Sequence, residues 1–176
     1  MLTHVAFLRG VNVGGHRVTN ERLAEVVGGL GFDEVATFQA SGNVLFGPST
    51  DAGEALAERL GTGLQAALGW AAPAFVRTRE RVQAIAGADV FPDAPAGSRV
   101  QVAFLDTPLD AHEQEAVRGH ALPTDDVVFD DVEMWWLLAT GRSTESGIGD
   151  PALARLLGDR WTVRTHATVQ RIARRL

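Results

Sequence analysis

Short apolar runs alternate with amphipathic stretches along the first half of the chain, and each type predicts a different element. The amphipathic stretches place leucine and valine at helical spacing over Leu23–Leu30 and Leu56–Leu68, which predicts two helices with one buried face each. The apolar runs predict four strands, at residues 3–9, 35–39, 44–46 and 74–77. The resulting order, strand–helix–strand–strand–helix–strand, is typical of the ferredoxin-like fold.

The second half predicts a similar order with less regular elements. Its first strand ends in Val-Ala-Phe-Leu at Val102–Leu105, the same four letters as Val5–Leu8. The other predicted elements are a helix near 80–86, a short helix after residue 110, a hairpin over 127–138, a helix over 151–157, an extended piece at 161–163 and a final helix over 165–176. The matching order indicates a partial duplication.

We therefore expect an α+β fold made of two ferredoxin-like (βαββαβ-type) subdomains, the second incomplete or modified, packed into one compact unit. The predicted boundaries are residues 1–78 for the first subdomain, a connector at 79–98, and residues 99–176 for the second subdomain with its terminal helix.

Capping residues predict where three of the helices begin. Thr19 or Asn20 can cap the first helix, Asp51–Glu54 resembles a capping box, and Asp110–Glu113 is expected to cap another short helix. A box of this kind satisfies two backbone N–H groups at the start of a helix. Gly69 is expected to end the second helix.

Composition narrows the chemistry that the chain can perform. Of its 176 residues 45% are apolar, as in a soluble globular protein with a core. All sixteen basic residues are arginine and cysteine is absent, which excludes disulfides, thiolate nucleophiles, lysine Schiff bases and the P-loop lysine. We expect no membrane span, no secretory signal and no cofactor, and a cytoplasmic location.

The formal net charge of −6 argues against a nucleic-acid binder. RNA binding is kept as a remote alternative, because RNA-recognition domains share this order of elements. Charge is uneven: residues 106–133 hold nine acids and one arginine, and residues 160–176 hold five arginines and no acid. Both stretches, and the pairs Asp125-Asp126 and Asp130-Asp131, are interpreted as solvated surface.

Two glycine-bearing loops carry the most informative chemistry. Leu8–Gly15 reads LRGVNVGG after the first strand, and Ser41–Asn43 reads SGN before the third. The third strand of this fold is antiparallel to the first and lies beside it, so we expect the two loops to meet at one end of the sheet. Arg9 offers a planar fork for a carboxylate or phosphate, and adjacent glycines allow a close backbone approach.

These features predict a site for a small anionic ligand, phosphorylated or carboxylated. The candidate residues are Arg9, Asn12, Gly14, Gly15, Ser41, Gly42, Asn43, Arg142, Arg164 and Thr168. The alternative is a non-catalytic interaction or homodimerisation module in which the loops are ordinary turns. The spacing is not that of a dinucleotide fingerprint, and the five histidines have no metal-ligand spacing, so no metal is expected. His16 adjoins the glycines and is the histidine of most interest.

Three segments resemble motifs of a bacterial family called domain of unknown function 1697. VAFLRGVNVGG at Val5–Gly15 resembles its opening strand and loop, TFQASGNVLF at Thr37–Phe46 its hairpin, and TVRTHATVQRI at Thr162–Ile172 its closing segment. The resemblance implies paired α+β subdomains and names no reaction.

The resemblance transfers directly to Arg9, Asn12, Gly14, Gly15, Ser41, Gly42, Asn43, Arg164 and Thr168. In the closing segment this chain has Thr165 and His166 where the family tends to have asparagine and tryptophan. Thr165 can still cap a helix, whereas the change to histidine weakens an aromatic stacking role. Arg142 follows Gly141 without the lysines that the family often has, so either Arg142 takes a larger share of any anion binding or that role is absent from this chain.

Overall fold

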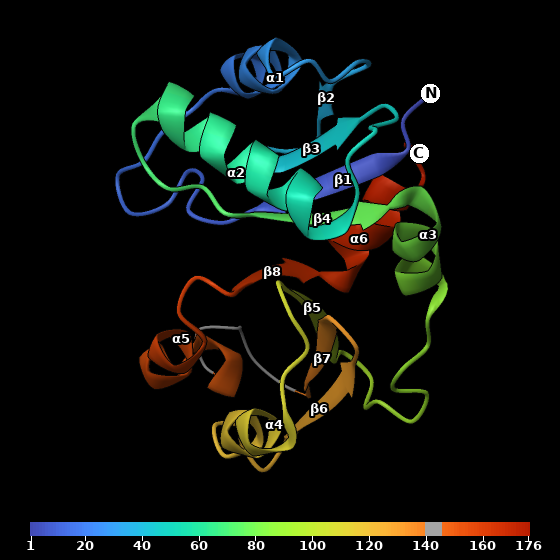
Figure 1. Ribbon diagram of the computed structural model, residues 1–176. Helices are drawn as coiled ribbons and strands as arrows, with labels where there is room; N and C mark the ends of the chain where they lie inside the picture. The colour runs from blue at the N-terminus through green and yellow to red at the C-terminus, as the bar shows by residue number, and fades with distance from the viewer. Residues whose placement is uncertain (140–145) are drawn as a thin grey trace. The chain divides into compact units, whose positions relative to one another are not determined.

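The computed structural model describes residues 1–139 and 146–176, which form two compact units. The first unit comprises residues 1–85 and 171–176, and the second comprises residues 86–170. Each unit holds one four-stranded antiparallel sheet with helices on one of its faces (Figure 1). The predicted division at residues 78 and 98 stays a prediction.

The first unit follows the predicted order of elements. Its strands are β1 (His4–Leu8), β2 (Ala36–Thr37), β3 (Asn43–Phe46) and β4 (Ala74–Thr78), and its helices are α1 (Asn20–Gly29), α2 (Gly53–Leu68) and the following α3 (Arg79–Gly87). The strands lie in the order β2-β3-β1-β4, with β1 antiparallel to both of its neighbours. This is the sheet order of the ferredoxin-like fold.

The core of the first unit lies between the sheet and helices α1 and α2. Leucines of α2 at helical spacing and valines of α1 pack against the face of the sheet that carries Ala6, Leu8, Val44 and Phe46. Phe46 is fully buried and its ring lies 4.9 Å from that of Phe32. The apolar periodicity of the two helices therefore predicted this core correctly.

The sequence predicted an incomplete or modified copy in the second unit. The structure has all four strands of the fold there. Its strands are β5 (Arg99–Leu105), β6 (Asp125–Asp130), β7 (Glu133–Leu138) and β8 (Trp161–Thr165), and its helices are α4 (Ala111–Arg118), α5 (Pro151–Leu157) and α6 (His166–Ala173). The modification is a 3-10 turn, η2 (Gly147–Gly149), before α5. The sheet order, β6-β7-β5-β8, matches that of the first unit strand for strand.

Two of the three predicted helix starts are confirmed. The Thr19 side chain caps α1, and Asp110 and Glu113 form a full capping box at α4. The predicted box at Asp51–Glu54 is wrong, because α2 begins after Ala52 with no side-chain cap. The Asp51 carboxylate instead pairs with Arg59 at 2.7 Å.

Candidate functional site

The two glycine-bearing loops meet at one end of the first sheet, as the antiparallel pairing predicted. The backbone N–H of Leu8 donates to the carbonyl of Gly42 at 2.8 Å, which joins the end of β1 to the start of β3. The next N–H, that of Arg9, donates to the carbonyl of Pro73 at 2.9 Å, just before β4. Three connections of the first unit therefore converge on this end of the sheet.

Asn12 fastens the long loop after β1. It adopts a left-handed backbone conformation, with φ of 57°. Its side-chain N–H donates to the carbonyl of Ala40 at 2.7 Å, and its side-chain oxygen accepts from the N–H of Val18 at 3.0 Å. One asparagine thus ties the two ends of its own loop together and ties that loop to the hairpin.

Asn43 has a similar role in the second loop. Its side chain is fully buried and donates to the carbonyl of Phe38 at 2.9 Å and to Oγ of Ser41 at 2.8 Å. Gly42 has φ of +70°, and a Cβ there would lie 3.0 Å from Cβ of Val11. The hydrogen bonds of Asn12 and Asn43 are therefore architectural, and the glycine lets the two loops pack in close contact.

The tip of the long loop, Val13–Arg17, is exposed. Gly14 and Gly15 have φ of +58° and +90°, and no described atom outside the adjoining residues lies within 4 Å of a Cβ built on either. The imidazole of His16 stacks on Trp70, with ring centroids 4.8 Å apart. Trp70 supports the tip from the segment before β4, and its buried Nε1 has no hydrogen-bond partner among the described residues.

Two arginines of the closing segment lie over the ring of Phe38, and neither was among the site residues predicted from the sequence. The guanidinium carbons of Arg171 and Arg175 lie 5.2 Å and 5.6 Å from the ring centre of Phe38, which is cation–π geometry. Phe38 also accepts the hydrogen bond from Asn43. The run of five arginines without an acid was the available signal, and it was interpreted as a solvated face.

Two further predicted site residues belong to the second unit, and a third lies outside the residues that the structure describes. Arg164 belongs to the second unit, where it donates to Oγ1 of Thr162 at 3.0 Å, and burial lowers its pKa to about 10. The N–H of Thr168, in the first turn of α6, donates to Oγ1 of Thr165, so Thr165 caps this helix. Arg142 lies outside the described residues.

Internal duplication is more extensive than the four shared letters indicated. Residues 76–86 read VRTRERVQAIA and residues 163–173 read VRTHATVQRIA, identical at seven of eleven positions. Both copies end their sheet's fourth strand and begin the next helix. Val5 pairs with Arg77, and the equivalent Val102 pairs with Arg164, so the registers agree.

The duplicated frame provides an internal reference for the loop site. The N–H of Asp106 donates to the carbonyl of Arg160 as that of Arg9 does to Pro73. In the first unit the connection from β1 to α1 is eleven residues long, Arg9–Thr19, whereas the equivalent connection in the second unit is five, Asp106–Asp110. The long loop is therefore an addition to a frame that the second unit forms without it.

Other acidic and histidine side chains of the second unit form hydrogen bonds that stabilise its fold. The carboxylate of Asp125, interpreted from the sequence as part of a solvated turn, accepts from Nε1 of Trp136 at 3.0 Å and from the N–H of Gly147. Nδ1 of His120 lies 2.8 Å from the carboxylate of Asp150, which caps α5. Two hydrogen bonds lower the pKa of Asp150. The larger effect comes from the N–H of Ala152 and the smaller from the ring of His120.

Two kinds of feature are absent from the described part of the chain. Within residues 1–139 and 146–176, no three His, Asp or Glu side chains gather as metal ligands would. No helix in those ranges has the length and apolar character needed to cross a membrane.

Comparison with known proteins assigns the chain to a family. The sequence profile of the family described as Protein of unknown function (DUF1697) matches residues 1–135, a range that contains both glycine-bearing loops. The chain belongs to this family of unknown function. No functionally curated protein matches it. A solved structure, that of a conserved bacterial protein from Streptococcus pneumoniae, is similar over 100% of this chain and 99% of that one, with 23% identity and a TM-score of 0.79. That likeness extends the shared fold beyond the profile match and through the closing segment.

Proposed function

We propose that the first unit of this DUF1697 protein binds a small anionic ligand, phosphorylated or carboxylated, at the tip of the Arg9–Arg17 loop. The observation that carries the proposal is the length of this loop. The second unit connects its first strand to the following helix with five residues in place of eleven. The additional residues are ordered by Asn12, which leaves the tip with the backbone of two glycines at the surface.

The chemistry of the loop supports an anion. Gly14 and Gly15 can present backbone N–H groups to a ligand at close range, since neither carries a side chain. Arg9, half-buried at the base, and Arg17, exposed at the tip, supply positive charge. Asn12 and Asn43 position the loops through their hydrogen bonds and take no direct part in binding.

A thermal-shift screen of phosphate, nucleotides, sugar phosphates and citrate tests this proposal. A ligand at about 100 times its Kd stabilises a protein by about 2.7 kcal/mol, a rise in Tm of about 5–10 °C for a chain of this size. We expect the Arg9→Ala and Arg17→Ala variants to lose that rise. Arg22→Ala, which removes an exposed arginine from α1 that pairs with Glu25, is the matched control and should keep it. A rise of equal size in all four proteins would overturn the proposal.

A second candidate function is a protein-interaction or homodimerisation module. One observation favours it: Val13, at the tip of the same loop, is 60% exposed. In that case light scattering should give a dimer mass that Val13→Asp reduces to a monomer mass. Leu156→Asp, at another exposed apolar position, should leave the mass unchanged. A monomer mass for the unmodified chain would remove the homodimer version of this candidate.

A further inference from the structure

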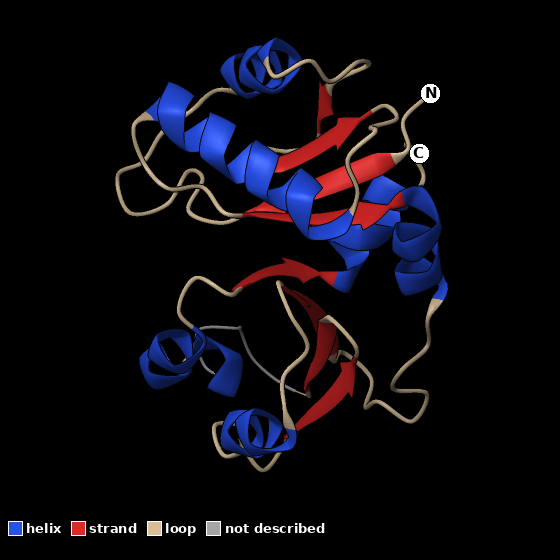
Figure 2. Cartoon of the chain, viewed as in Figure 1, coloured by secondary structure: helices blue, strands red, loops and turns tan. Residues whose placement is uncertain are grey.

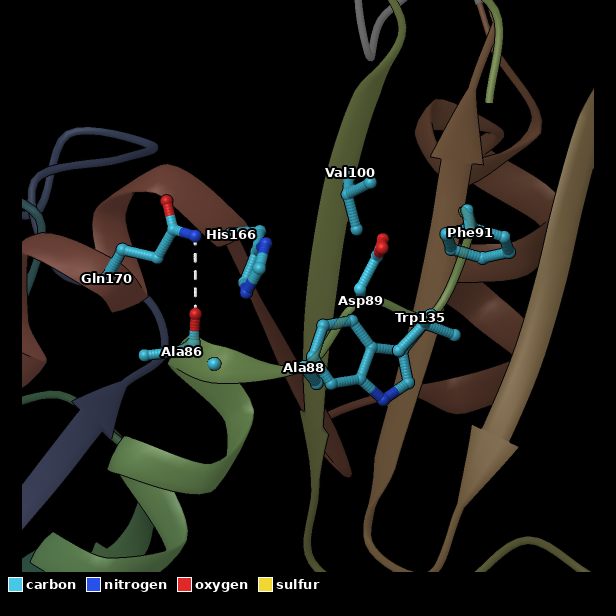
Figure 3. Close-up of a pocket in the computed structure, with 10 residues that line it drawn as sticks. Ala86, Ala88, Asp89, Phe91, Val100, Trp135, His166 and Gln170 are labelled. Atoms are coloured by element: carbon cyan, nitrogen blue, oxygen red, sulfur yellow. Dashed lines mark hydrogen bonds between the residues drawn. The ribbon is translucent and has the colours of Figure 1, made fainter. Parts of the chain in front are cut away.

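A cavity of about 330 Å³ lies in the second unit and shares no residue with the proposed anion site (Figure 3). Its wall consists of the segment Ala86–Phe91, together with Val100 of β5, Trp135 of β7, and His166 and Gln170 of α6. The volume is at the lower end of the range for small-molecule sites. No part of the proposed function uses it.

The geometry of the cavity is held by two contacts within its own wall. The side-chain N–H of Gln170 donates to the carbonyl of Ala86 at 3.2 Å, which fastens the segment from Ala86 onward to α6 (Figure 3). The rings of Trp135 and His166 meet edge to face, with centroids 5.3 Å apart and an interplanar angle of 74°. Trp135 is only 3% exposed, so the ring that supports His166 is itself fixed by the sheet.

The side chains of the wall favour a ligand with a positive charge and an apolar body. Phe91, Trp135 and Val100 provide aromatic and aliphatic surface. Asp89 adds a carboxylate, an acceptor with a negative charge. None of the ten lining residues, all of them within the described part of the chain, is an arginine or a lysine. An anion would meet repulsion from Asp89, and no arginine or lysine in the wall would offset it.

We propose that this cavity binds a small organic cation with an apolar body, such as an arylalkyl ammonium. The ammonium group donates to the carboxylate of Asp89, and the apolar body lies against Phe91 and Trp135. A charged hydrogen bond fixes one end of the ligand and removal of apolar surface from water holds the other. The required charge is opposite to that of the ligand proposed for the first unit.

Isothermal titration calorimetry with phenethylamine, a cation at neutral pH, tests the proposal on the full chain. We expect one saturable site per chain with a Kd of about 1 mM or tighter. Phenylacetate, with a similar body and a negative charge, should show no saturable binding that the cavity variant Ala88→Leu removes. Asp89→Asn keeps the shape of the side chain and removes its charge, so the affinity should fall about tenfold. Asp93→Asn, an exposed acid outside the lining, is the matched control and should bind as the unmodified chain does.

A second variant tests the position of the ligand independently of charge. Ala88→Leu adds a branched side chain to the lining and should abolish binding while Tm stays unchanged. The proposal is overturned if phenethylamine does not saturate, or if it binds Asp89→Asn and Ala88→Leu as tightly as the unmodified chain. Anion stabilisation through the first unit is measured separately and can succeed or fail without affecting this result.

Discussion

The first strands of the two units end on the same letters and then diverge in charge. Leu8 is followed by Arg9, whereas the equivalent Leu105 is followed by Asp106, and both following N–H groups make the same hydrogen bond to the residue before the fourth strand. The third residues of the helices that come next are Arg22 and Glu113. Equivalent backbone positions in one chain thus carry opposite charges.

At this end of its sheet the second unit pairs the acidic side chains with an arginine. Arg160, at the position of Pro73, contacts Asp106 at 3.4 Å, Oγ1 of Thr107 at 3.0 Å and the carboxylate of Glu113. The bond to Glu113 is the main cause of a raised pKa at Arg160. In the first unit a proline replaces the central arginine, and a glycine loop extends beyond the sheet (Figure 2). The difference shows that this end of the frame is closed by ion pairs in one unit and extended as a loop in the other.

The largest loss of stability is expected from substitutions at equivalent positions in the cores of the two units. Phe46 and Trp136 occupy matching positions on the third strands and are both fully buried. Replacing either with alanine leaves a cavity, so each variant should lose about 3–5 kcal/mol of stability in urea unfolding. Leu122→Ala, at a 43% exposed position, is the control and should lose less than about 0.5 kcal/mol. A loss below about 1 kcal/mol at one core position would break the equivalence of the units.

A smaller loss of stability is expected at Gly42, a glycine with no counterpart in the second unit. Gly42→Ala should cost about 2–3 kcal/mol, because its φ of +70° strains an L-residue and the new Cβ approaches Val11. Gly14→Ala, with φ of +58° in open space, should cost about 1 kcal/mol from backbone strain alone. Val132 holds the place of Gly42 in the second unit, which shows that the turn there differs. Equal costs at Gly42 and Gly14 would mean that the two loops are not in close contact.

Asn12 and Asp110 fasten the equivalent connections of the two units by different means. Asn12→Ala removes hydrogen bonds to Ala40 and Val18, and Asp110→Ala removes a helix cap, so each should cost about 1–2 kcal/mol. Hydrogen exchange separates the two. Protection of the Val18 amide should fall in Asn12→Ala and remain in Asp110→Ala. If Val18 stays protected in both variants, the loop tip is not held by Asn12.

Most of the fold was predictable because it follows from periodicity. The helix faces and the central strands carry strong apolar patterns, and the approach of the two loops follows from antiparallel pairing. The fourth strand of the second unit was predicted too short, since its last residues, Arg164 and Thr165, are polar. The repeated VRT and VQ-x-IA letters would have shown that this strand and the helix after it copy β4 and α3.

The candidate site was only partly predictable. Asn12 and Asn43 have the same donors and acceptors whether they bind a ligand or their own loops, so sequence alone does not separate the two roles. The stacking of His16 on Trp70 and the approach of Arg171 to Phe38 join residues far apart in the chain. Such contacts depend on how loops lie over the frame, and no local pattern encodes them.

The smallest effect concerns pH and tests whether the second unit is closed by its ion pairs. Two hydrogen bonds lower the pKa of Glu113. The larger effect comes from the Arg160 guanidinium and the smaller from the N–H of Asp110. A carboxylate with a lowered pKa stabilises the fold above its unfolded pKa of about 4.3, and this contribution is lost as pH falls through the lower folded value. Glu113→Gln keeps the capping box and removes the charge. Its Tm should therefore lie below that of the unmodified chain at pH near 7, and the difference should close towards pH near 3. Glu115→Gln, an exposed position on the same helix, should show little difference at any pH. A gap for Glu113→Gln that stays constant with pH would mean that Arg160 does not hold this carboxylate, and the contrast between the units would then rest on loop length alone.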